Sequence, residues 1–181
     1  MKQEIDWNHW LGENSARLML YARQQCRSEA DAEDVLQESL VQLVQTVEAG
    51  EFKGVPEQWL SYVYTTIRHR AMDRGRRAEV RRNYVSRMYE VEQAEGYCDP
   101  WLVSSPDDEL IRAKAEELLK EINPDHAEVI VLKIWGERTF SDIADILGLP
   151  PSTVGSRYRY GIQALRRAFD ELNIDLSPQA N

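Results

Sequence analysis

The sequence has 181 residues, of which 29% are charged and 43% hydrophobic, and its formal net charge is −9. This length suits one domain or two small ones, and no apolar run approaches the roughly 20 residues that cross a bilayer. The first six residues lack a basic start followed by an apolar stretch, so we expect no secretory signal, no membrane insertion and a cytoplasmic protein. Cys26 and Cys98 have no cysteine or histidine at metal-binding spacing, which predicts neither a metal nor a cofactor.

Positive charge is concentrated in one short segment. Residues 68–87 hold eight arginines and two acidic residues, whereas residues 1–67 hold 11 acidic against 5 basic and residues 88–126 hold 11 against 3. A protein that coats nucleic acid would be basic throughout. The distribution therefore predicts a localised anion-binding site within an acidic chain.

Helical spacing of apolar residues recurs along the chain, while strand-like alternation is scarce, so we predict an all-α fold. Residues 88–107 combine acidic residues with glycine, proline and serine, as is typical of a linker. The prediction is therefore two small helical domains joined by an acidic linker. The expected helices cover residues 10–26, 31–47, 57 into the arginine segment, 108–122 and 124–135, with a loop at 52–56 and Asn123-Pro124 opening the last of these.

Residues 140–169 have the features of a helix-turn-helix. Ser141 is expected to cap a short first helix, small Ala144 lets a second helix approach, and Gly148 supplies the turn at positive φ. Pro150-Pro151 then opens the second helix, because proline is tolerated in a first turn. The side chains expected to face inward from this helix are Val154, Tyr158, Leu165 and Phe169.

The outer half of this second helix predicts DNA binding. It offers short hydroxyls and arginines, and no carboxylate occurs between residues 152 and 169. Such side chains reach base edges and phosphates when a helix start enters a major groove. An ordinary helical hairpin with a solvated polar face is the alternative. The candidate DNA-binding residues are Ser152, Thr153, Ser156, Arg157, Arg159 and Tyr160.

The arginine segment follows a helix that bears Trp59, Tyr62 and Tyr64. Arginine contacts phosphate, and an aromatic face that stacks on an unpaired base contributes about 1–3 kcal/mol, so the combination suits strand-separated DNA. The alternative places the aromatic residues in the core and the arginines on a solvated face. We favour the core for Trp59 and nucleic acid for the arginine cluster.

Acidic residues crowd the start of the helix over 31–47. Some of them complement the helix dipole. However, Asp34, Gln37, Glu38 and Val41 share one face by three- and four-residue spacing, which suits a basic helical partner. A carboxylate cluster could also hold a metal for nuclease chemistry, but no histidine accompanies it and the helix start explains it. We therefore predict no catalytic residue and a protein that is not an enzyme.

These segments resemble the ECF (extracytoplasmic function) sigma factors of bacteria. Residues 31–38, DAEDVLQE, are similar to the family's DAEDLVQE segment. The resemblance implies that Asp34, Gln37 and Glu38, with their neighbours Asp31 and Val41, bind the clamp coiled coil of the RNA polymerase β′ subunit.

Residues 62–74 resemble the family helix that melts and reads the −10 element, and the loop at 52–56 corresponds to the one that captures a flipped base. The implied −10 site comprises Tyr64, Arg68, His69, Arg70, Asp73, Arg74, Arg76 and Arg77. Residues 143–148, 153–157 and 164–166 resemble the domain that reads the −35 element, which assigns the candidate residues of the second helix to that role.

The sequence departs from the family pattern at several positions. His69 stands where asparagine is usual, Gly155 replaces a usual lysine or arginine, and residues 160–163 replace a stretch richer in arginine and alanine. Glycine inside a helix costs roughly 0.5–1 kcal/mol relative to alanine, and Gly161 adds a second such position. The second domain is therefore expected to bind DNA weakly, or only when polymerase holds it in place.

The resemblance implies a sigma factor that directs core RNA polymerase to promoters. Its partners would be core polymerase, through the β′ clamp coiled coil and the β flap, and promoter DNA, and whether an anti-sigma factor also binds stays open. A stand-alone helix-turn-helix regulator and a helical protein-binding adaptor are the alternatives. The expected parts are residues 1–87 for polymerase and the −10 element, 88–107 as the linker, 108–170 for the −35 element and 171–181 as a tail.

Overall fold

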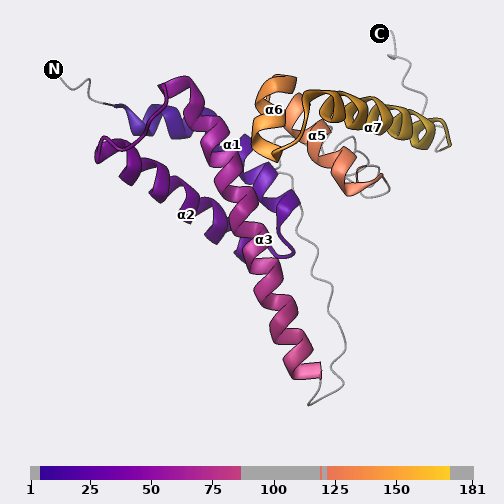
Figure 1. Ribbon diagram of the computed structural model, residues 1–181, viewed down its shortest axis with the longest axis horizontal. Coiled ribbons are helices and arrows are strands. Elements are labelled where there is room, and N and C mark those ends of the chain that lie inside the picture. Colours follow the sequence, from indigo (N-terminus) through magenta and orange to yellow (C-terminus); the bar gives the residue numbers. More distant parts are fainter. Residues whose placement is uncertain (1–4, 87–118, 120–121, 172–181) are drawn as a thin grey trace, which may run out of the picture. The chain divides into compact units, whose positions relative to one another are not determined.

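The structure, a computed structural model, describes residues 5–86, 119 and 122–171, with side chains described up to residue 77 in the first stretch and up to 168 in the last. The chain divides into two compact units, Met1–Leu102 and Val103–Asn181. Helices and turns make up the described residues, which include no strand, so the predicted all-α fold of two helical domains is confirmed (Figure 1). The predicted linker over 88–107 and the predicted helix over 108–122, apart from residues 119 and 122, lie outside the described residues.

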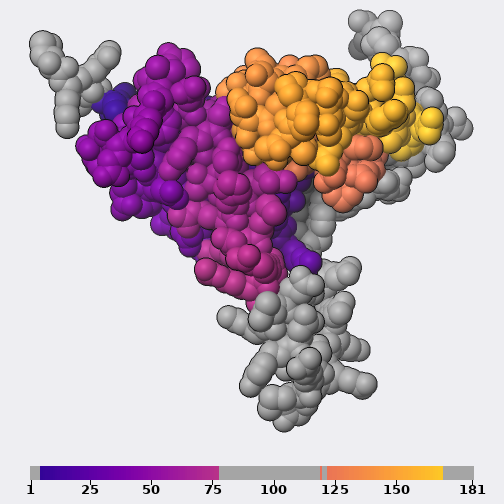
Figure 2. All heavy atoms as spheres, viewed as in Figure 1, coloured from indigo at the N-terminus to yellow at the C-terminus, as the bar shows by residue number. Residues whose placement is uncertain are grey.

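The first unit contains three long helices, α1 (Trp7–Gln25), α2 (Glu29–Glu48) and α3 (Trp59–Ser86), with a 3-10 turn, η1 (Pro56–Gln58), leading into α3. Each of the three long helices packs against the other two. Their shared core contains the fully buried side chains Leu18, Tyr21, Val35, Leu43, Val63, Tyr64 and Ile67. Figure 2 shows these helices, in indigo to magenta, as one packed body.

An aromatic cluster joins the start of α1 to the start of α3. The Trp59 side chain is buried and its ring stacks on Trp7 with a centroid separation of 5.0 Å. Trp10 meets the same ring edge-on at 6.2 Å. The predicted core position of Trp59 is confirmed, and the cluster ties the two helix starts together.

The second unit contains α5 (Pro124–Ile134), α6 (Phe140–Leu147) and α7 (Pro151–Glu171). Asn123 caps α5, as predicted, by accepting a hydrogen bond from the Asp125 amide at 2.9 Å. Gly148 ends α6 at φ 65°, so the predicted left-handed turn is confirmed. Val154 is buried, and Tyr158 and Leu165 pack against a core formed by Ile122, Ala127 and Ile130, as predicted, while the Phe169 side chain lies outside the described residues.

The cap of α6 differs from the prediction. Thr139, and not Ser141, is the N-cap: its hydroxyl accepts from the Asp142 amide at 3.1 Å, and the Asp142 carboxylate accepts from the Thr139 amide at 2.9 Å. This reciprocal pair requires a hydroxyl three residues before an acidic or amide side chain, and Thr139 has that spacing to Asp142 whereas Ser141 does not.

The capping pair makes the stability of the second unit sensitive to acid. Burial raises the pKa of Asp142, but the hydrogen bonds from Thr139 and the nearby charges of Arg138 and Lys133 outweigh burial and hold that pKa below its ordinary value of 3.8. A carboxyl with a lowered folded-state pKa stabilises the fold above its unfolded pKa, and that stabilisation is lost as pH falls through the folded value.

We expect Asp142→Asn, which keeps the side-chain acceptor and loses the charge, to be less stable than the wild type by about 1 kcal/mol at pH 7. The difference should shrink as the pH falls below about 4, because the Asp142 carboxyl then takes up a proton, first in the unfolded chain and at lower pH in the folded one. Thermal unfolding of both proteins from pH 7 to pH 3 measures this. A difference that stayed constant over the whole range would show that the charge of Asp142 is irrelevant.

The helices that the structure describes include none with the length and hydropathy needed to span a bilayer.

Candidate nucleic-acid and partner-binding surfaces

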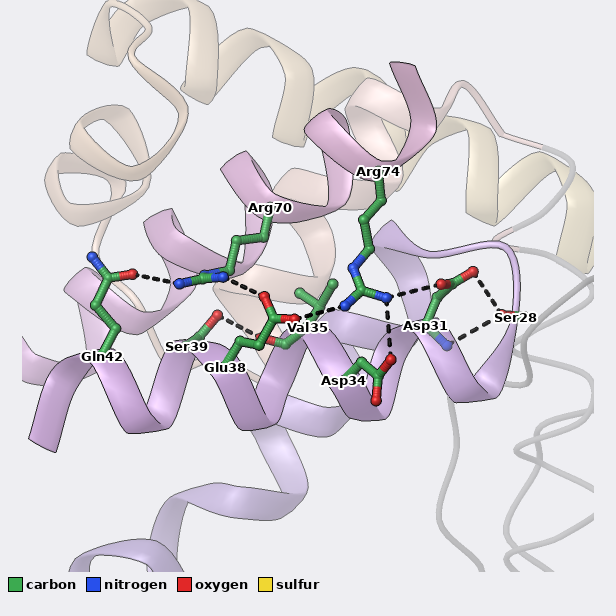
Figure 3. A network of polar contacts seen from close by, with 9 residues as sticks. All are labelled: Ser28, Asp31, Asp34, Val35, Glu38, Ser39, Gln42, Arg70 and Arg74. Carbon is green, nitrogen blue, oxygen red and sulfur yellow. Dashed lines mark hydrogen bonds and ion pairs between the residues drawn. The ribbon is translucent and has the colours of Figure 1, made fainter. Parts of the chain in front are cut away.

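Arg74 of α3 lies against the acidic start of α2 and contacts three carboxylates (Figure 3). Its Nη1 donates to Asp31 Oδ1 at 3.1 Å and to Asp34 Oδ2 at 3.3 Å. Its Nη2 donates to Glu38 Oε1 at 2.8 Å. Burial by itself lowers the pKa of Arg74, but the hydrogen bonds to the three carboxylates outweigh it and hold that pKa above its ordinary value. Arg74 is therefore charged at every physiological pH.

Arg70 lies one turn before Arg74 and extends the same network along α2. It pairs with the second carboxylate oxygen of Glu38 and donates through Nη2 to Gln42 Oε1 at 2.9 Å (Figure 3). Both carboxylate oxygens of Glu38 thus accept hydrogen bonds from arginines of α3. Two arginines predicted to bind DNA are in fact bonded to acidic residues predicted to bind polymerase.

The acidic face of α2 remains accessible beside this network. The side chains of Asp34 and Glu38 are 62% and 46% exposed despite their ion pairs. Gln37 and Val41 are also exposed, and Asp31 is half-buried, with one carboxylate oxygen accepting from Ser28 at 2.7 Å. The structure therefore brings the five predicted polymerase-binding residues to one side of α2. Within the described residues, no group of acidic, histidine or cysteine side chains could hold a metal ion.

The described residues of the arginine segment other than Arg70 and Arg74 lie mostly at the surface of α3. His69, Asp73, Arg76 and Arg77 are exposed, as is Met72, and Arg68 is half-buried. Arg76 pairs with Asp73 one turn away at 3.1 Å. Because both members of that pair are more than half exposed, the pair is weak and leaves the Arg76 guanidinium available to another anion. The side chains of Arg81, Arg82 and Arg87 lie outside the described residues.

Tyr64 occupies a different place from the one the prediction requires. Its side chain is fully buried, and its ring meets Tyr21 of α1 edge-on with centroids 5.1 Å apart. A base could stack on this ring only if α1 and α3 separated. Position 64 points into the three-helix core, so we remove it from the candidate DNA-binding surface.

The loop before α3 is partly ordered by its own side chains. Residues 56–58, whose start was predicted as loop, form the turn η1, and Gln58 accepts from the Val55 amide at 3.1 Å. The Phe52 ring meets Tyr62 edge-on at 5.4 Å, and Val55 is 55% exposed. Gln58 stands three residues after the cap position, from where a glutamine side chain reaches back to the cap amide, but Val55 at the cap gives no sequence signal for this contact.

The start of α7 presents the predicted −35 residues in two groups. Ser152, Arg159 and Tyr160 are exposed, and Thr153, Ser156 and Arg157 are half-buried. Arg157 Nη2 donates to Asp125 Oδ2 of α5 at 2.6 Å. The Arg159 guanidinium lies 5.0 Å from the centre of the Tyr160 ring, and that ring lies 6.2 Å from His126. Asp125 and His126 belong to α5 and lie outside the helix-turn-helix segment, so the sequence pattern gave no signal for their contacts with α7.

The two glycines inside α7 are not equivalent. A Cβ atom added at Gly155 would meet nothing within 4 Å. At Gly161 it would lie 2.7 Å from Ile130 Cδ1 and 3.1 Å from His126 Cβ. Gly161 therefore allows α7 to approach α5 closely, whereas the structure offers no packing reason for Gly155.

Two families match the chain, one in each unit. Residues 11–81 match Sigma-70 region 2, and residues 118–167 match Sigma-70, region 4. The chain is 31% identical over 163 residues to the ECF RNA polymerase sigma factor SigL of Mycobacterium tuberculosis, in three strains. That alignment covers 90% of this chain and 88% of SigL.

The fold is also similar to a solved structure. It is the co-crystal structure of the sigma factor RpoE in complex with the anti-sigma factor NepR from Bartonella quintana, with a TM-score of 0.68 and 18% sequence identity. The match covers 91% of this chain and 97% of that chain, and at this identity it speaks for the fold alone. Because both sigma-70 regions occur in order and the identity to SigL extends over nine tenths of its length, the chain belongs to the ECF RNA polymerase sigma factors, which direct transcription initiation.

Proposed function

We propose that the two units divide the work of promoter recognition between three surfaces. The acidic face of α2 binds core RNA polymerase, the exposed face of α3 contacts the −10 element, and the start of α7 reads the −35 element. Residues 1–87 and 108–170 would be the two functional domains, joined by residues 88–107. The observation that carries the proposal is the separation of charge: exposed carboxylates gather on α2, whereas Arg76 and Arg77 are exposed on α3 and Arg159 is exposed near the start of α7.

For polymerase binding, the exposure of Asp34, Gln37, Glu38 and Val41 is the main support. Carboxylates around an exposed apolar side chain suit a partner helix with basic residues about an apolar centre. Because the chain as a whole carries a net charge of −9, free binding to bulk DNA is weak, and core polymerase supplies the additional phosphate contacts that a promoter complex needs.

For the −10 element, we retain the residues of α3 that are exposed or half-buried and lie away from the network with α2. The proposed set is Arg68, His69, Asp73, Arg76 and Arg77. Arginines on this face contact phosphates, and His69 can accept from or donate to a base edge. Tyr64 is left out because it is buried, and Arg70 and Arg74 because their guanidinium groups are bonded to α2.

For the −35 element, we retain Arg157 because its guanidinium pairs with Asp125 through Nη2, whereas that of Arg74 reaches three carboxylates through both Nη atoms. A guanidinium fixed at one edge by a carboxylate presents its remaining donors in a defined direction, which favours contact with a base over a diffuse phosphate contact. Ser152, Thr153, Ser156, Arg159 and Tyr160 complete this surface. The protein would act in the cytoplasm as a binding subunit without a catalytic step of its own, and an inhibitor of the anti-sigma type is a further proposed partner.

Arg157→Ala tests the proposal that the start of α7 reads the −35 element. With core polymerase and the purified wild-type protein, we expect promoter-specific run-off transcripts. The variant should lower transcription about tenfold at promoters that depend on the −35 element, because it loses one base contact worth about 1–3 kcal/mol. Arg167→Ala removes an exposed arginine near the other end of the same helix, so it is the control and should have little effect.

Equal transcription by the wild type and Arg157→Ala would remove this residue from the −35 site. Tight promoter binding by the protein without polymerase would contradict the proposed dependence on core enzyme and favour a stand-alone regulator.

A further inference from the structure

Arg70 and Arg74 bond to side chains of α2 and in this respect differ from Arg76 of the same helix. Arg74 reaches three carboxylates of α2, and Arg70 reaches the third of them, Glu38, together with Gln42 (Figure 3). Both side chains are only about one third exposed, whereas Arg76 is 75% exposed. The hydrogen bonds from the Arg74 guanidinium to α2 are therefore already formed in the protein without nucleic acid.

The carboxylates that Arg74 joins would repel one another without it. Asp31 and Asp34 are three residues apart, and Asp34 and Glu38 four, so all three lie on adjacent turns of one helix face, where like charges destabilise the helix. A single guanidinium placed among them neutralises part of this repulsion. It also restricts the side-chain rotamers of the carboxylates, because each accepts from a fixed donor.

We propose that Arg74, assisted by Arg70, is a positioning residue for polymerase binding and not a DNA ligand. It holds Asp31, Asp34 and Glu38 as a preformed acidic face, whose outward lone pairs remain open to basic side chains of the partner. A preformed face loses less side-chain freedom on binding than three independent carboxylates would. This inference rests on the proposed function, in which that face of α2 binds core polymerase.

The experiment measures two affinities for each variant in the full-length chain. The first is the affinity for core RNA polymerase, and the second is the affinity of the assembled holoenzyme for a single-stranded −10 oligonucleotide. Arg74→Ala should weaken core binding about fivefold to tenfold and leave oligonucleotide binding within about twofold. Arg76→Ala is the matched arginine control and should do the opposite. Arg74→Lys, which keeps one cation but lacks the planar fork, should lie between the wild type and Arg74→Ala.

A second control distinguishes the positioning of the acidic side chains by Arg74 from a general stabilisation of the contact between two helices. Glu29 of α2 pairs with Arg23 of α1, away from the acidic face. Glu29→Gln removes this contact between helices, so it should lower the thermal midpoint of unfolding while leaving core affinity unchanged. If core affinity fell in step with the thermal midpoint in both Glu29→Gln and Arg74→Ala, Arg74 would have only a structural role and the inference would be overturned.

Asp34→Ala distinguishes failure of this inference from failure of the proposed function. If Asp34→Ala weakens core binding and Arg74→Ala does not, the acidic face binds polymerase but Arg74 does not organise it. If neither variant weakens core binding, the polymerase face itself is wrong and the inference falls with it. Loss of oligonucleotide binding by Arg74→Ala, with or without loss of core binding, would make this residue a DNA ligand and overturn the inference.

Discussion

Tyr64→Ala is expected to destabilise the first helical unit by about 3–5 kcal/mol, as is usual when a buried aromatic side chain is truncated. The Tyr64 ring is fully buried and packs edge-on against the equally buried Tyr21, so its removal leaves a cavity at the centre of the core between α1 and α3. Small domains are stable by about 5–15 kcal/mol, so this loss is a large fraction of the total.

Two further variants complete the test of Tyr64. Tyr64→Phe keeps the ring and its packing against Tyr21, so it should change stability by less than about 1.5 kcal/mol, far less than Tyr64→Ala. Tyr160→Ala, at a tyrosine that is 51% exposed, should change stability by less than about 0.5 kcal/mol. Urea unfolding followed by circular dichroism measures all three. A Tyr64→Ala protein with wild-type stability but without −10 DNA binding would return Tyr64 to the DNA site.

Gly161→Val is expected to destabilise the second unit by about 1–3 kcal/mol, the usual range for overpacking. The new Cβ atom would lie 2.7 Å from Ile130 Cδ1 and 3.1 Å from His126 Cβ, closer than side-chain carbons approach each other. Since Ile130 is itself fully buried in the core, it has little room to move, and α7 must shift away from α5. Any such shift also moves Arg157 relative to Asp125.

Gly155→Ala is the matched control on the same helix, because open space surrounds the position of the added carbon. It should stabilise the second unit by roughly 0.5–1 kcal/mol, since alanine restricts the unfolded chain and favours the helix. Thermal unfolding of the two variants side by side measures the contrast. Equal effects of the same sign at the two positions would show that close packing at Gly161 is not what requires glycine there.

Local rules were sufficient wherever a feature depends on residues next to one another in the chain. Asn123 and Pro124 predict the start of α5, because a cap followed by a residue without an amide hydrogen suits the first turn of a helix. Gly148 predicts the turn between α6 and α7, because it adopts positive φ at little cost. The prediction that Ser141 caps α6 was wrong by the same local rules, because the reciprocal contact between Thr139 and Asp142 requires the three-residue spacing that these two residues have.

The sequence by itself therefore determined the all-α class, most helix boundaries and the segments that resemble sigma-factor regions. It also determined that net positive charge is concentrated in residues 68–87 and that the last helix carries no carboxylate between residues 152 and 169. It did not determine which arginines bond to a neighbouring helix and which remain exposed. Periodicity gives the angle of a side chain around its helix but not the residue that packs against it.

Only the tertiary structure assigned those neighbours. Arg74 meets carboxylates that lie 36 to 43 positions earlier in the chain, and Arg157 meets one that lies 32 positions earlier. Arg76, two residues after Arg74, points to a different side of α3 and pairs with a residue of its own helix. The energy of an ion pair depends on the distance between charges and on their burial, and both quantities exist only once the helices have packed.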